Sequence, residues 1–184
     1  SSDEVKRERI LTTAEEQNLL SHCTDRRTHL KPLIVAAIDT GCRQGELFKL
    51  RWSDIDFATG VIIIRAFNTK TMRERSVSLT NRLRSELVSL VRRETKPNDL
   101  VFGIKADVRG AFRRTCKEAG LVGLRFHDLR HTHATRLDEL GFSLAKIGGQ
   151  LGHTVVQTTL RYVNRDSVAV QQVAVALDRF NASI

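Results

Sequence analysis

One β-branched stretch interrupts a chain whose apolar residues otherwise recur at helical spacing. Residues 61–64 have the sequence VIII, and residues 75–79 alternate polar and apolar side chains, which is typical of a half-buried strand. The polar residues 68–71 between them suit a hairpin connection that would hold Lys70 near its tip. The sequence therefore predicts a mainly α domain with a small antiparallel β-sheet (α+β) near residues 61–79.

Helices are expected on both sides of this sheet. Thr12 or Thr13 can cap the first helix, because a glutamate stands three residues after each and completes a capping box. Apolar spacing predicts a second helix at residues 29–39, which Gly41 ends, and a third helix after Thr80. Later segments have helical patterns separated by glycines and a polar turn, at residues 108–119, 127–140, 144–151, 155–163 and 168–180.

The excess of positive charge favours a polyanionic partner. Lys and Arg number 30 against 21 Asp and Glu, which gives a formal net charge of +9. Such a chain attracts nucleic acid, although a merely solubilising positive surface has the same composition. Aromatic residues make up only 5% of the chain, which disfavours a single-strand surface built from stacking rings.

The chain length, the short apolar runs and the spacing of the cysteines exclude several other classes of protein. The 184 residues are enough for one domain with its own core, and no apolar run has the length of a membrane helix. Cys23, Cys42 and Cys116 are scattered without CxxC spacing, which disfavours a disulfide framework or a thiolate zinc site. We therefore expect a reducing, cytoplasmic setting. Because the chain opens without Met and without a signal-like segment, we also expect it to be part of a longer protein.

Three histidines and an arginine fall within residues 127–133 (HDLRHTH). Residues three or four apart share a helix face, so His127, Arg130 and His131 are expected to point to one side. Zinc is disfavoured, because Asp128 replaces the glutamate of HExxH and Arg130 would repel a cation. A phosphate suits the set, since guanidinium offers a bidentate fork and imidazole can move a proton. Taken alone, this pattern would favour an ordinary helix whose polar residues are exposed to solvent.

Other segments carry residues of the same kind. Arg43 follows a glycine in TGCRQGEL, Lys70 lies in NTKT, and His153 in LGH stands nine residues before Tyr162, the single tyrosine. With HDLRHTHAT, these resemble the catalytic domain of the tyrosine recombinase (phage integrase) family. That family's pattern has an arginine in TGxRxxEL, a hairpin lysine, HxLRHTxAT, and LGH followed by a tyrosine. The order and approximate spacing agree over nearly the whole chain.

The resemblance implies a site-specific DNA recombinase or integrase that breaks and rejoins strands through a 3′-phosphotyrosyl intermediate, with no metal or other cofactor. Tyr162 would be the nucleophile. A phosphodiester repels nucleophiles, so its charge must be offset in the transition state. Arg43 and Arg130 are the candidate clamps on the non-bridging oxygens, and the resemblance gives His153 the role of a further donor.

Proton transfer falls to other residues of the set. A phenol has an ordinary pKa near ~10, so it must lose its proton as it attacks. His127 is the candidate base, and the resemblance makes Lys70 the candidate acid for the leaving 5′ oxygen. Glu46, one helical turn after Arg43, is expected to orient site residues, and His131 is expected to support them.

Four further arginines are candidates for contacts to the backbone of duplex DNA. Arg73 and Arg75 lie beside the hairpin, and Arg113 and Arg114 lie on one helical stretch. A run of charged residues is also typical of a solvent-exposed helix face, so this pattern alone does not decide whether these arginines contact DNA.

The resemblance also bears on assembly and domain organisation. The apolar helix expected at residues 167–181 would dock into a neighbouring protomer and form a homo-oligomer on DNA, although it could also pack on its own domain. Relatives carry a core-binding domain upstream, and nothing like it precedes the motifs. Residues 1–184 are thus expected to be the catalytic domain of a phage-encoded or bacterial protein.

Two other functions remain open. Residues 143–163 have the texture of a helix-turn-helix, which would suit a non-catalytic DNA-binding module. A type IB topoisomerase would use the same tyrosine chemistry.

Overall fold

A computed structural model describes residues 9–66, 73–104 and 107–152. The helices of this part are α1 (Thr13–Ser21), α2 (Leu30–Thr40), α3 (Gln44–Phe48), α4 (Asn81–Val88), α5 (Arg109–Glu118), α6 (Asp128–Glu139) and α7 (Leu144–Leu151). The strands are β1 (Ile55–Asp56), β2 (Val61–Ile64) and β3 (Arg75–Ser78), and short 3₁₀ turns lie at Asp25–Arg27 and Trp52–Asp54. The expected mainly α fold with one small sheet is confirmed.

The sheet is antiparallel, with strand order β1-β2-β3. Ile62 pairs with Val77, and each is 2% exposed, whereas Ile63 on the opposite face is 38% exposed. This alternation follows from the two-residue period of a strand, which sends successive side chains to opposite faces. β2 and β3 are thus the strands predicted at residues 61–64 and 75–79.

Local signals fix several helix ends. The hydroxyl of Thr12 accepts from the Glu15 N–H at 3.2 Å, and the Glu15 carboxylate accepts from the Thr12 N–H at 3.0 Å, so Thr12 is the cap of α1. Thr80 caps α4, because its hydroxyl accepts from the Leu83 N–H at 3.2 Å. Gly41 ends α2 with φ +63°, a conformation that favours glycine.

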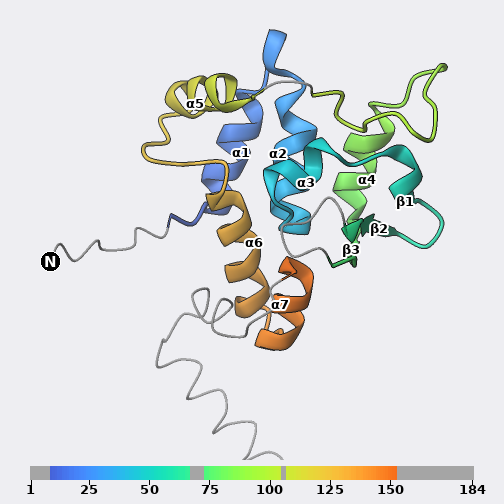
Figure 1. The fold of residues 1–184 in the computed structure, drawn as a ribbon. Helices are drawn as coiled ribbons and strands as arrows, with labels where there is room; N and C mark the ends of the chain where they lie inside the picture. Colours follow the sequence, from blue (N-terminus) through green and yellow to red (C-terminus); the bar gives the residue numbers. More distant parts are fainter. Residues whose placement is uncertain (1–8, 67–72, 105–106, 153–184) are drawn as a thin grey trace, which may run out of the picture.

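Helix α2 is the centre of the core and positions the site. Leu30, Leu33 and Ile34 have no exposed side-chain surface, and truncating any one of them to Ala would cost about 2–5 kcal/mol. α2 packs against α4 on one side and α6 on the other, and Figure 1 shows it between these helices. As a result, the end of α2 and the loop after it lie against α6.

Within the described residues, no helix combines the length and apolar character needed to cross a bilayer. Cys23, Cys42 and Cys116 are buried free thiols. Burial raises the pKa of Cys23 and of Cys116 to about 11, so these thiols are poor nucleophiles at neutral pH.

Candidate active site

Arg130 joins three of the motif segments. It is 2% exposed, and it donates from Nη1 to the Gly41 carbonyl at 2.6 Å and from Nη2 to the Leu151 carbonyl at 2.6 Å. Gly41 stands two residues before Arg43, and Leu151 stands two residues before His153. A single guanidinium from α6 therefore holds the TGCR loop next to the end of α7.

The histidines flanking Arg130 face the same way. The His127 and His131 rings pack edge to face, with centroids 5.0 Å apart, as their i and i+4 positions predict. Arg130 itself turns inward toward α2 and α7 rather than lying with the rings on the outer face. Partial burial lowers the pKa of His127, and the nearby His131 and Arg130 lower it further. His127 is therefore a neutral imidazole at neutral pH.

Arg43 is held by Glu46. Arg43 precedes α3, its side chain is 27% exposed, and its Nη1 donates to Glu46 Oε1 at 3.0 Å. Glu46 Oε2 accepts from the Arg43 backbone N–H at 2.8 Å. Burial alone would raise the pKa of the Glu46 carboxyl, but the ion pairs with Arg75 and Arg43 outweigh it and hold the pKa low. This geometry is consistent with the orienting role expected of Glu46.

Arg75 does not fit its predicted role as a DNA contact. Its side chain is 8% exposed, and its Nη2 pairs with the buried Glu46 carboxylate at 2.6 Å. Its Nε donates to the Gln150 carbonyl at 2.8 Å. The sequence shows an arginine beside a polar hairpin but not the carboxylate that folds against it, so this burial could not be predicted.

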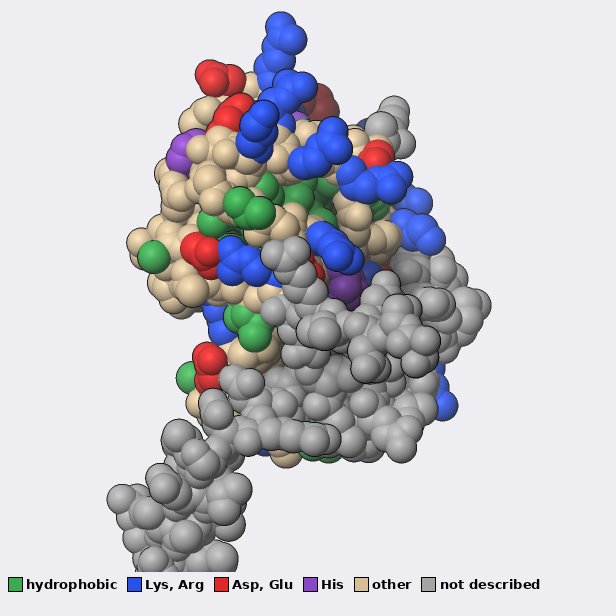
Figure 2. Space-filling model, turned by 90° about the vertical axis from the view of Figure 1, so that its left-hand side faces the viewer, with side chains coloured by type: hydrophobic (Ala, Val, Ile, Leu, Met, Phe, Trp, Pro, Cys, Tyr) green, Lys and Arg blue, Asp and Glu red, His purple; other side chains and the backbone are tan. Residues whose placement is uncertain are grey.

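The other predicted DNA contacts are exposed. Arg73 precedes β3, and Arg113 and Arg114 lie on the outer face of α5. Figure 2 shows Lys and Arg side chains over the upper part of the face on which α5 lies. Their contact with DNA stays a prediction.

Lys70, His153 and Tyr162 lie outside the described residues. The sequence still places two of them close to described elements. Lys70 stands five residues before β3 begins, and His153 follows α7 after one residue.

A basic hollow of about 510 Å³ lies beside His127. Its lining includes Arg109, Arg113 and Arg125, together with Gln44 from the start of α3. The Gln44 Nε2 is buried without a hydrogen-bond partner. A concave surface with three guanidinium groups next to the candidate base has the charge to hold a polyanion.

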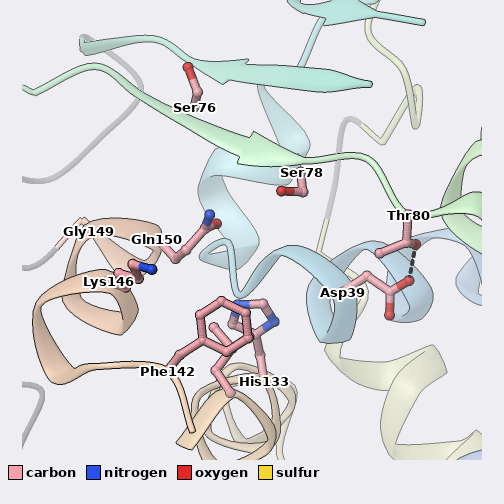
Figure 3. A pocket seen from close by; sticks show the side chains of 10 residues that line it. Asp39, Ser76, Ser78, Thr80, His133, Phe142, Lys146, Gly149 and Gln150 are labelled. Carbon is pink, nitrogen blue, oxygen red and sulfur yellow. Dashed lines mark hydrogen bonds between the residues drawn. The ribbon is translucent and has the colours of Figure 1, made fainter. Parts of the chain in front are cut away.

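A second hollow, of about 430 Å³, lies between α6, α7 and β3. Figure 3 shows the Phe142 ring over His133, with Lys146 and Gln150 of α7 on one side and Asp39 on the other. His133 is 7% exposed, its Nδ1 donates to the Ile38 carbonyl at 2.8 Å, and its Nε2 has no partner. No specific role for His133 was evident from the sequence. Its position three residues after Arg130 on the same helix was the one sequence signal that its side chain also faces α2.

Among the described residues, no three His, Cys, Asp or Glu side chains come together as metal ligands.

Comparison with known proteins identifies the family of this chain. The model of the phage integrase family matches residues 9–168, and the chain belongs to that family. It is 32% identical to the shufflon-specific DNA recombinase of Escherichia coli over 163 residues, which cover 86% of this chain and 40% of that protein.

Two further comparisons agree. The chain is 32% identical to tyrosine recombinase XerA of Saccharolobus solfataricus, over 86% of this chain and 53% of that protein. The Tn1549 transposon integrase, solved in complex with circular intermediate DNA, shares the fold with a TM-score of 0.77. It is 22% identical, over 95% of this chain and 67% of that one. The chain thus spans about half the length, or less, of these two curated relatives.

Proposed function

We propose that this chain is the catalytic domain of a site-specific DNA recombinase that acts on duplex DNA in the cytoplasm. The observation that carries the proposal is the Arg130 side chain, which links the loop before Arg43 to the end of α7. The charges of Arg43 and Arg130 both lower the pKa of His127, which supports a common centre for these three side chains. Relatives named as recombinases, and a structural neighbour bound to DNA, support this assignment.

In the proposed reaction, the Tyr162 oxygen attacks the scissile phosphorus and the bond from phosphorus to the 5′ oxygen breaks. The phenol proton passes to His127, and Lys70 gives a proton to the leaving 5′ oxygen. Arg43 and Arg130 offset the charge on the non-bridging oxygens. The phosphotyrosyl bond keeps the energy needed for a second 5′ hydroxyl to reseal the strand.

A nicked suicide DNA substrate tests this function. The protein is expected to form a covalent adduct that survives a denaturing gel, and peptide mapping should place the DNA on Tyr162. DNA binding without any adduct on a suitable site would instead indicate the helix-turn-helix module. Relaxation of supercoils by an isolated monomer, without strand exchange, would indicate a type IB topoisomerase.

The lowered pKa of His127 predicts the pH dependence of cleavage. A base acts only when unprotonated, so the single-turnover rate should fall on acidification through a pKa below the ordinary ~6.5. His127→Gln should lower the rate by about 10²–10⁴-fold and remove this acid limb. An acid limb in wild type at or above the ordinary histidine pKa would contradict the assignment.

The exposed arginines of α5 predict a salt effect. Each phosphate contact releases counterions, so removing both Arg113 and Arg114 should reduce the slope of log K against log salt by about 2. The matched control is Arg92→Ala with Arg93→Ala, because these exposed residues follow α4 on the other side of the molecule from α5. An unchanged slope in the α5 variant would show that this face is only solvated.

We also propose that residues 167–181 of one protomer dock into the hollow of Figure 3 on a second copy. The segment is rich in Val and Ala, and Leu137 and Phe142 give the hollow an apolar wall. Phe142 is 44% exposed, so the hollow has an apolar rim. Phe142→Asp should abolish assembly on a two-site DNA in light scattering without affecting single-site binding. Unchanged assembly would contradict this docking site.

A further inference from the structure

We propose that Arg75 is a positioning residue that holds the Arg43 loop, the strand after the Lys70 hairpin and the end of α7 in one arrangement. The inference rests on the proposed function. It replaces the expected DNA contact at this residue with a role inside the site.

The contacts of Arg75 reach two separate segments from β3. Nη1 and Nη2 donate to the two oxygens of Glu46, at 3.1 and 2.6 Å, and Nε donates to the Gln150 carbonyl at 2.8 Å. Nη2 also lies 3.7 Å from the Sγ atom of Cys42, which is the residue directly before Arg43 in the sequence. One planar side chain therefore spans α3, α7 and the strand that carries it.

Glu46 transmits this arrangement to Arg43. The carboxylate is 2% exposed and is shared, because Oε1 accepts from both Arg75 Nη1 and Arg43 Nη1. Without Arg75, the buried carboxylate would keep only the side-chain and backbone N–H groups of Arg43 as partners. The carboxylate would then be able to turn, and the Arg43 guanidinium would turn with it.

The end of α7 is held in the same way. Gln150 and Leu151 supply successive carbonyls of the last turn, and these accept from Arg75 and Arg130. Carbonyls of a last helical turn lack intrahelical donors, so guanidinium groups are favourable there. Gly152 follows with φ +66°, and a Cβ at this residue would lie 3.1 Å from the Arg75 guanidinium. His153 is the next residue in the sequence.

The test is Arg75→Lys, because an ammonium keeps the charge but cannot form the bidentate pair and the Gln150 contact together. Single-turnover cleavage of the nicked substrate is measured at saturating DNA, and affinity is measured separately across salt concentrations. Cleavage should fall by about 10²-fold, the effect of a misplacement of about 1 Å, while affinity and salt slope stay as in wild type. Arg65→Lys is the matched control, since Arg65 also pairs with a carboxylate that is 2% exposed, on Asp54.

Weaker binding with a smaller salt slope and an unchanged rate at saturation would make Arg75 a DNA contact and overturn the inference. Rates are compared at a temperature where each protein is fully folded, so a lower Tm alone does not count.

Gly152→Ala gives a second test, because it crowds the same guanidinium without removing it, and it should lower the rate but not the affinity. Equal cleavage by Gly152→Ala and wild type would overturn the inference. A wild-type protein that forms no adduct would overturn the proposed function itself.

Discussion

Tyr162→Phe is expected to abolish the covalent adduct with a nicked substrate while leaving DNA affinity unchanged. The chain has one tyrosine, so no second phenol can take its place. Phenylalanine keeps the ring and removes only the oxygen that would bond to phosphorus. Loss of a nucleophile lowers the rate by on the order of 10⁶-fold, which on a denaturing gel is complete loss.

The control measurement for this substitution is its affinity for DNA. Phosphate contacts from arginines and lysines supply most of the affinity for DNA, and they do not involve the phenol oxygen. Affinity and its salt slope should therefore match wild type within error. Adduct at the wild-type level would mean that another hydroxyl attacks, and the proposed reaction would be wrong.

The fold was predictable where its signals are local. The capping box at Thr12, the left-handed glycine at Gly41 and the alternation of Ile62 with its neighbours each depend on residues a few positions apart. These patterns gave the sheet and the main helices correctly. The helices expected at residues 155–163 and 168–180 lie outside the described residues and stay predictions.

The site was predictable only in part. The motif order selected Arg43, His127 and Arg130 as candidates, because each stands in a short recognisable pattern, and their roles stay predictions. The role of Arg75 could not be inferred, since its carboxylate partner is 29 residues away. His133 was equally hidden, because the carbonyl that holds it is 95 residues away. Charge and polarity along a sequence do not show which groups become partners after folding.

Arg130→Lys is expected to lower both the cleavage rate and the stability. The rate should fall by about 10³-fold, because the ammonium loses the planar fork that meets phosphate oxygens and stabilises the transition state. The buried Arg130 also donates to two carbonyls 2.6 Å away, and a lysine cannot meet both with the same geometry. Leaving one buried acceptor without a donor should reduce the free energy of unfolding by about 1–3 kcal/mol.

The two effects are separable by measurement. Denaturant unfolding gives the loss of stability, and single-turnover cleavage of the fully folded variant at saturating DNA gives the loss of rate. Arg93→Lys serves as the control, because Arg93 is exposed in the segment after α4 and lines neither hollow, so it should change neither quantity by a comparable amount. A variant that is destabilised but cleaves at the wild-type rate would show that Arg130 has a structural role only. Because Arg130 fixes the Gly41 loop and the end of α7 together, we expect both losses.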